Sequence, residues 1–292
     1  MHAQNTPSAL TGIGLTLLAC LAFSVLDAGS KYMGALLPLL MALWLRYALQ
    51  TMATVGYGLA TAGISIFRTQ HWRFQCIRAA LFCMSNAFAM LILSHLALAE
   101  FSAFAAMSPV AMTLVAALWL HQPVSPLRWV LVTLGFAGTL IIVRPGSGAF
   151  SAQALLWPLL QMLSNTAYQI VSSEMAGKER PLTTQIYTSL VALALTTACL
   201  PWVWTPIMSS GLLLGTLAMG LGSAIGHLCV LKAYEHARPA TITPFFYSQI
   251  LFAAAAGWLM YRHVPDQWAV VGMLVIIASG ALSAWLSVRE SK

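Results

Sequence analysis

Charged side chains are what this sequence has least of. Asp, Glu, Lys and Arg together make up only 7% of its 292 residues, whereas 60% of the residues are hydrophobic. Soluble domains usually carry about 25% charged residues, so a water-soluble globular fold is excluded. Apolar runs of roughly 20 residues, each long enough to cross about 30 Å of hydrocarbon, recur along the chain. The sequence therefore predicts an all-α polytopic protein whose first partner is the lipid bilayer.

Motifs for metals, cofactors and nucleotides are missing as well. The sequence contains no CxxC pair, no HExxH zinc motif and no GxxxxGK[ST] loop, so we expect no metal, no cofactor and no ATP hydrolysis. The five cysteines lie inside apolar segments, which is typical of small core residues. The net charge of +7 comes from Lys and Arg residues that stand singly between apolar runs. This pattern indicates membrane topology and not nucleic-acid binding.

Two stretches of the chain repeat each other. Residues 116–132 (AALWLHQPVSPLRWVLV) match residues 255–271 (AAGWLMYRHVPDQWAVV) without gaps. The identical positions in the first copy are Ala116, Ala117, Trp119, Leu120, Pro126, Trp129 and Val132. Because internal repeats determine architecture, we expect two related halves, residues 1–145 and 146–292.

Ten helices are predicted, five in each half. The apolar runs cover 10–28, 37–60, 74–96, 101–120, 127–143, 152–173, 185–203, 212–231, 240–261 and 268–286. With the N-terminus inside, most Lys and Arg residues, Arg78 among them, fall on the cytoplasmic side, and only Lys31, Arg144 and Arg262 fall outside. Cytoplasmic loops carry an excess of these residues, so both termini should be cytoplasmic.

An odd number of helices per half has a consequence for the fold. The second half must enter the membrane in the opposite sense to the first, which gives two inverted five-helix repeats. Inverted repeats are a transporter architecture, with the binding site near the midplane where the halves meet. A secondary-active transporter of a small organic molecule, working by alternating access, is therefore predicted.

The first helix of each half carries a polar stripe at spacings of three and four residues, which place side chains on one face. The first stripe comprises Thr16, Cys20, Ser24, Asp27 and Lys31. The second comprises Gln161, Asn165, Tyr168 and Ser172. Such stripes either line a transport path or make hydrogen bonds between helices.

Asp27 and Arg46 are the two ionisable residues placed most firmly within the predicted spans. A charge at that depth costs about 2.5–3.5 kcal/mol on insertion scales, so it needs a partner. We expect the two to pair with each other, or one to meet a charged substrate group or a proton, the candidate coupling ion. The structural alternative is an ion pair alone, or a bond from Asp27 to Lys31.

Other candidates occur singly. His227 and Asn86 are predicted to face the path or to bond a neighbouring helix. Pro109 and Pro244 lie inside predicted helices, where they either permit gating or only bend the chain. The remaining cavity-lining candidates are Tyr47, Tyr247 and Gln249. Glycines at Gly211, Gly215, Gly222 and Gly226 favour close helix packing.

The sequence offers two rival functions. The segment 220–224 (GLGSA) resembles the GxSG of a rhomboid-like serine hydrolase, but its last Gly is Ala and His227 follows on the same helix. An intramembrane enzyme is thus a distant alternative. A channel is disfavoured because the sequence has no filter motif and no ring of charges.

The helix count and the repeat together resemble the drug/metabolite transporter superfamily, EamA type. The motifs are LGFAGTLIIV in the first half, PATITPFFYSQILFAAAAGWL and VVGMLVIIASG in the second, and the DAGSK and WLRY segments at Asp27–Lys31 and Trp44–Tyr47. The resemblance implies a carrier in the bacterial inner membrane, a monomer or a homodimer. Its implied solute is an amino acid-like or vitamin-like metabolite, with uptake of riboflavin or S-adenosylmethionine as the alternative. The Gly-Glu common at the ends of helices 4 and 9 is absent here.

Overall fold

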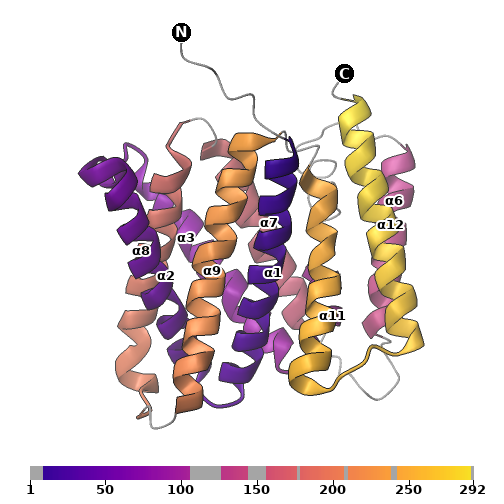
Figure 1. Ribbon diagram of the computed structural model, residues 1–292, viewed down its shortest axis with the longest axis horizontal. Coiled ribbons are helices and arrows are strands. Elements are labelled where there is room, and N and C mark those ends of the chain that lie inside the picture. Colours follow the sequence, from indigo (N-terminus) through magenta and orange to yellow (C-terminus); the bar gives the residue numbers. More distant parts are fainter. Residues whose placement is uncertain are drawn as a thin grey trace.

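Every regular element in the part of the chain that the structure describes is a helix (Figure 1). The structure is a computed structural model, and it describes residues 9–105, 126–143, 156–175, 178–206, 210–237 and 242–290. The first half holds α1 (Ala9–Gly34), α2 (Leu39–Ala62), the 3₁₀ helix η1 (Gly63–Phe67), α3 (Trp72–Leu93), α4 (Leu98–Ala105) and α6 (Pro126–Val143). The second half holds α7 (Leu156–Met175), α8 (Pro181–Val203), α9 (Ser210–His236), the 3₁₀ helix η3 (Thr243–Tyr247), α11 (Ser248–Tyr261) and α12 (Gln267–Glu290).

Several of these helices have the length and composition of membrane spans. Four described segments are long and apolar enough to cross a bilayer, namely Leu10–Gly34, Trp72–Leu93, Pro181–Val203 and Gly211–His236. At 1.5 Å per residue each is about 33 Å long or more, which matches the hydrocarbon thickness. Large apolar side chains such as Leu214 and Leu251 point outward. The chain is therefore a multi-pass membrane protein.

Helices of one half pack mainly against helices of the other. The main contacting pairs are α1 with α9, α3 with α7, α2 with α9, α3 with α8, α2 with α8, α4 with α11, α6 with α12 and α1 with α11. Exchanging corresponding helices of the two halves turns α1–α9 into α3–α7 and α2–α9 into α3–α8, and it leaves α2–α8, α4–α11 and α6–α12 unchanged. The pair α1–α11 stands outside this pattern. The packing thus has an approximate two-fold symmetry. In Figure 1, α1 lies between α9 and α11, both from the other half.

The counterpart helices α2 and α8 run in opposite directions. The indole of Trp44 on α2 donates to the Thr197 hydroxyl on α8 at 2.9 Å. Further along α2, the hydroxyl oxygen of Thr54 lies 3.3 Å from that of Ser189 on α8. Moving forward along α2 therefore means moving backward along α8. In Figure 1, α1 begins and α12 ends at the same end of the bundle, which we call the termini end. The opposite end, where α1 finishes, is called the Lys31 end.

Glycines bring the crossing helices close together. On α9, a methyl group at Gly222 would lie 2.8 Å from the carbonyl oxygen of Ala22, and one at Gly226 would overlap the ring of Phe23. The close packing predicted for these glycines is confirmed. A second contact was not predicted: Gly138 of α6 and Gly272 of α12 face each other backbone to backbone.

Helix boundaries differ from the prediction in one way that affects the site. The first helix was predicted to end at Ala28, but α1 continues to Gly34. The polar residues near its end have partners inside the bundle: the Ser30 hydroxyl donates to the Leu26 carbonyl at 2.8 Å, and the Lys31 ammonium donates to two carbonyls at the end of α3. Asp27 therefore lies well inside the helix. Most of the predicted helix 101–120 and of the first repeat, 116–132, lies outside the described residues.

Candidate functional site

A cavity of about 210 Å³ lies where the two halves meet. Its walls come from α1, α2, α3 and α4 of the first half and from α7, α9 and α11 of the second. It brings together most of the predicted site residues: Asp27, Arg46, Asn86, Gln161, Asn165, His227 and Gln249. The polar stripes of both halves therefore reach one cavity, as the path interpretation requires.

Arg46 is held rigidly at the wall of this cavity. Its guanidinium donates to the side-chain oxygen of Asn86 at 2.7 Å, and through Nε and Nη2 to the Ser223 hydroxyl at 3.4 and 3.2 Å. Ser223 in turn donates to Gln50 at 2.7 Å. The network joins α2, α3 and α9 around a side chain that is only 4% exposed. A buried polar network with these bonds holds its members in one geometry.

Asp27 faces the same cavity from α1. One of its carboxylate oxygens accepts a hydrogen bond of 3.2 Å from the side-chain amide of Gln249 on α11. The direct ion pair between Asp27 and Arg46 that we expected is not formed, because amide and hydroxyl partners from α3, α9 and α11 occupy the two groups. The alternative bond to Lys31 is not formed either, since that ammonium binds the carbonyls of Leu93 and Leu96.

Four aromatic rings cross the bundle beside the cavity. Phe23 meets His227 edge to face at a centroid distance of 5.1 Å, His227 meets Phe82 at 5.7 Å, and Phe82 lies 5.2 Å from Tyr168. Phe82 precedes His227 in the sequence by the same number of residues as Phe23 precedes Tyr168. The two outer contacts are therefore counterparts, and the central contact falls on the two-fold axis.

The predicted tyrosines are not part of the cavity wall. Tyr47 is fully buried behind Arg46, whose guanidinium lies 5.5 Å from the Tyr47 ring centroid. Tyr247 packs among apolar residues of α12, and a methyl group at Gly280 would overlap its hydroxyl. These residues support the site from behind or lie away from it. Pro244 is in η3, and its gating role stays a prediction; Pro109 lies outside the described residues.

Arg78 was missed as a site residue because it was counted among the cytoplasmic loop charges. The structure places it inside α3 at 3% exposure. Its guanidinium donates to the Tyr168 hydroxyl at 3.2 Å, to the Thr184 carbonyl at 2.5 Å and to the Thr188 hydroxyl. Its position within the predicted helix 74–96, one turn before Phe82, was the available signal. Ser30, Ser85 and Phe82 also line the cavity without having been predicted.

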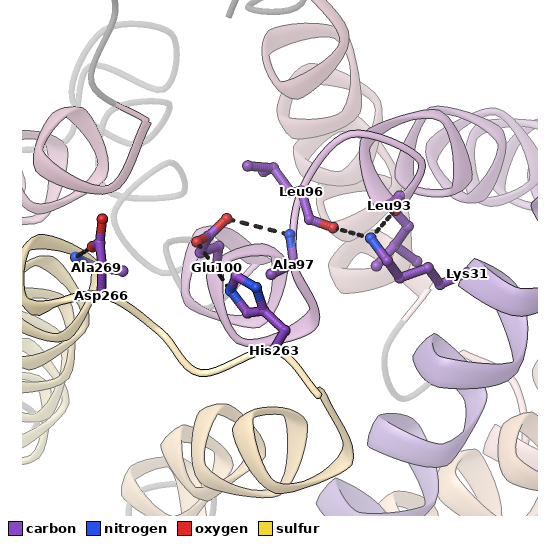
Figure 2. Close-up of polar contacts among 8 residues, drawn as sticks. All are labelled: Lys31, Leu93, Leu96, Ala97, Glu100, His263, Asp266 and Ala269. Carbon is purple, nitrogen blue, oxygen red and sulfur yellow. Dashed lines mark hydrogen bonds and ion pairs between the residues drawn. The ribbon is translucent and has the colours of Figure 1, made fainter. Parts of the chain in front are cut away.

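A second cavity of about 330 Å³ lies at the Lys31 end. Figure 2 shows its charged groups. Lys31 reaches the C-terminal end of α3. Glu100 lies between the backbone N–H of Ala97, which donates to its carboxylate at 3.2 Å, and the ring of His263, whose nitrogen is 3.7 Å from that carboxylate. Leu93 lines the first cavity, and its carbonyl binds Lys31 in the second. The end of α3 therefore lies next to both cavities.

Comparison with known sequences agrees with this geometry. The EamA-like transporter family matches the chain twice, over residues 10–144 and 152–285. The chain belongs to the EamA-like transporter family. Within this family, the two matches correspond to the halves whose helices interlock in the structure.

Similar proteins of this transporter family are matched over nearly their whole length. A pseudopaline exporter of Pseudomonas aeruginosa is 27% identical over 94% of this chain and 96% of its own. A riboflavin transporter of Vibrio cholerae is 25% identical, covering 97% and 96%. An S-adenosylmethionine uptake transporter of Rickettsia felis is 22% identical, covering 92% and 90%.

The fold of the family is also found among solved structures. One crystal structure aligns with a TM-score of 0.70 at 18% identity, and the alignment covers 97% of this chain and 99% of that chain. At this identity the match shows the fold alone. The interlocked helices of this EamA-like chain are therefore an arrangement that an experimentally solved protein shares.

Proposed function

We propose that the chain is a secondary-active transporter of a small organic metabolite in the bacterial inner membrane. It would have ten spans in two inverted halves, 1–145 and 146–292, with both termini in the cytoplasm. The observation that carries the proposal is the cavity between the halves, which contains one acidic and one basic side chain, Asp27 and Arg46, from the interior of the bundle. A cavity at the interface of repeats is where carriers bind their solutes.

The residues of the cavity suit a zwitterionic or largely neutral solute. The planar guanidinium of Arg46 can bind a carboxylate through two parallel hydrogen bonds. Asp27, together with the amide of Gln249, offers acceptors for an amino or other cationic group. Phe23, Phe82 and Phe101 supply apolar wall. A polyanion such as a sugar phosphate would need more cationic groups than Arg46.

We further propose that a proton is the coupling ion and that Asp27 carries it. Asp27 is a carboxylate inside the bundle, and the group that donates a hydrogen bond to it is the amide of Gln249 and not a cation. Intramembrane carboxylates of this kind are typical of proton relays. Because the chain has no nucleotide-binding loop, uphill transport has to draw on an ion gradient.

An enzymatic function is not part of this proposal. Ser223 would be the nucleophile of the rhomboid-like alternative, but its hydroxyl donates to Gln50 at 2.7 Å, and the ring nitrogen of His227 lies 2.8 Å from the Ser223 backbone carbonyl. A serine nucleophile needs a base at its hydroxyl. Family membership and the transporter names of the relatives favour a carrier that does no covalent chemistry.

The test combines two measurements. Metabolites are compared inside and outside cells with and without the gene, because the relatives include both an exporter and uptake carriers. The purified protein is then reconstituted in liposomes, and flux of the identified solutes, with riboflavin and S-adenosylmethionine in the first panel, is measured with and without an imposed proton gradient. Accumulation that depends on the gradient is expected. If no solute moves in either experiment, the carrier proposal is wrong.

A further inference from the structure

Two buried arginines join counterpart pairs of helices. Arg46 of α2 donates to the hydroxyl of Ser223 on α9, and Arg78 of α3 donates to the hydroxyl of Thr188 on α8. The two-fold symmetry exchanges α2 with α8 and α9 with α3. The two bonds therefore occupy equivalent places with the groups reversed. In the first, the arginine is on α2 and the hydroxyl on α9, whereas in the second the hydroxyl is on α8, the counterpart of α2, and the arginine is on α3, the counterpart of α9. Arg78 also precedes Ser223 by the same number of residues as Phe82 precedes His227.

The aromatic rings divide the space between these arginines. Along α3, Asn86, the partner of Arg46, lies one turn after Phe82, and Arg78 lies one turn before it. Arg46 faces the cavity on the Lys31 side of the Phe82 ring. Arg78 lies on the side of the termini end, where its bond to the Tyr168 hydroxyl holds that ring against Phe82.

One N–H group of Arg78 makes no hydrogen bond. In the described part of the chain, its Nε atom is buried and has no hydrogen-bond partner, although the guanidinium as a whole is 3% exposed. A buried unsatisfied donor on a charged group is costly. A carboxylate that entered from the termini end would accept from Nε and, in place of the Thr188 hydroxyl, from the neighbouring Nη2, in the two-bond geometry that arginine favours.

We infer that Arg78, with Tyr168 and Thr188, forms a second half-site, which binds the acidic group of the same solute when the cavity around Arg46 closes. Alternating access moves one repeat against the other around the site, and because a two-fold symmetry relates the halves, the second access state is the one in which they have exchanged conformations. In that exchange the packed surroundings of Arg78 become open, and the open surroundings of Arg46 become packed. The inference rests on the proposed transport and adds to it a residue that is hidden in the present state.

Thiol accessibility tests this without knowledge of the solute. The starting protein is the full chain with Cys20, Cys76, Cys83, Cys199 and Cys229 replaced by Ser or Ala. Single cysteines are then introduced by Ser85→Cys in the cavity and Thr188→Cys beside Arg78. Right-side-out and inverted membrane vesicles are treated with an anionic and a cationic membrane-impermeant methanethiosulfonate of similar size.

The expected result has two parts. Ser85→Cys reacts from one face of the membrane and Thr188→Cys from the opposite face. At Thr188→Cys the anionic reagent reacts about thirtyfold faster than the cationic one, because attraction of the anion and repulsion of the cation each contribute a factor of about five for unit charges about 4 Å apart in water-like surroundings. Arg78→Gln abolishes this preference and Arg78→Lys retains it. Thr196→Cys, equally buried on the same helix and bonded to its own backbone, is the matched control and stays unreactive.

The outcomes that contradict the inference differ from those that contradict transport. If Thr188→Cys is silent, or reacts from the same face as Ser85→Cys, or shows no charge preference, the half-site at Arg78 is wrong while the carrier proposal stands. If Ser85→Cys is also silent from both faces, the transport path itself is wrong. Thr184→Cys, whose backbone accepts a bond from Arg78, repeats the measurement should Thr188→Cys fold poorly.

Discussion

The rings of Phe82 and His227 meet edge to face with their centroids 5.7 Å apart. They occupy equivalent positions in the two halves, yet one is apolar and the other carries two nitrogens. His227 uses one nitrogen to contact the Ser223 carbonyl of its own helix at 2.8 Å. The ring contact thus needs only an aromatic ring, whereas proton transfer would need the imidazole.

Substituting His227 by Phe separates these two roles. The Phe ring keeps the edge-to-face contacts to Phe23 and Phe82, each worth about 0.5–1.5 kcal/mol beyond area burial. We expect His227→Phe to unfold within about 1 kcal/mol of the parent in detergent titrations and to keep its uptake rate. A large loss of gradient-driven uptake with an unchanged unfolding midpoint would instead assign His227 to the proton path.

Arg46→Gln is expected to lower uptake at least tenfold. The neutral side chain cannot bind a carboxylate through the two charge-assisted bonds available to Arg46, and it leaves Asn86 and Ser223 with poorer partners. Uptake rates in proteoliposomes measure the effect. The rate of Arg46→Lys should fall between those of the parent protein and Arg46→Gln, because lysine keeps the positive charge but lacks the paired N–H donors of the guanidinium. The control is Arg180→Gln, an exposed arginine bonded to Ser65. Equal rates in Arg46→Gln and the control would refute a binding role.

Asp27→Asn tests the proton-carrying role. The Asn oxygen can still accept the bond from Gln249, so the local geometry is kept while the ionisable group is lost. We expect solute exchange between equilibrated compartments to continue and accumulation driven by a proton gradient to stop. Asp27→Ala, which also breaks the bond, should impair both. Gradient-driven accumulation that survives in Asp27→Asn would exclude Asp27 as the proton carrier.

The contact of α6 with α12 makes Gly272 intolerant of a side chain. A methyl group there would lie 2.6 Å from the carbonyl oxygen of Gly138. Gly272→Ala should therefore destabilise the protein by about 1–3 kcal/mol, as overpacked sites do. Gly56→Ala, where nothing lies within 4 Å, should be neutral or stabilising by up to about 1 kcal/mol. Unfolding in mixed detergent compares the two variants, and similar midpoints would contradict the close approach.

The contact between Glu100 and His263 is expected to contribute little to stability. The side chains are 17% and 43% exposed and 3.7 Å apart, and exposed pairs are typically worth about 0–1 kcal/mol. A double-mutant cycle with Glu100→Gln and His263→Ala should give a coupling energy below about 1 kcal/mol. A coupling above about 2 kcal/mol would show that the contact locks α4 to the loop before α12.

Much of the architecture followed from local rules. The apolar runs predicted helices, because a segment in hydrocarbon has to satisfy its backbone hydrogen bonds internally. The glycines of α9 predicted close packing against another helix, although not that the partner is α1, because small residues let helix backbones approach. The polar stripes also predicted that residues as distant in sequence as Asp27 and Asn165 would reach the same cavity. These features depend on which residues tolerate contact with lipid, and the amino-acid composition of each segment shows that directly.

The partners of individual side chains could not be predicted in the same way. Asp27 and Arg46 were expected to pair because opposite charges attract, but neutral amides and a hydroxyl from three other helices occupy them. Arg78 was counted with the loop charges, although Thr188 and Tyr168 bind it inside the bundle. Such partners are set by how different helices cross in the bundle, and the spacing of residues within one segment does not report that.

The interlocking of the halves also constrains how the protein is made. α1 emerges from the ribosome first, but α9, its main packing surface, begins at Ser210. Until then the bare glycines and polar stripe of α1 lack their final neighbours, so assembly is dominated by contacts distant in sequence. The largest packing surfaces of α1 and α3 belong to helices of the second half, so a chain truncated between the halves removes them. The two halves are one cooperative unit of biogenesis, even though the same family model matches each of them.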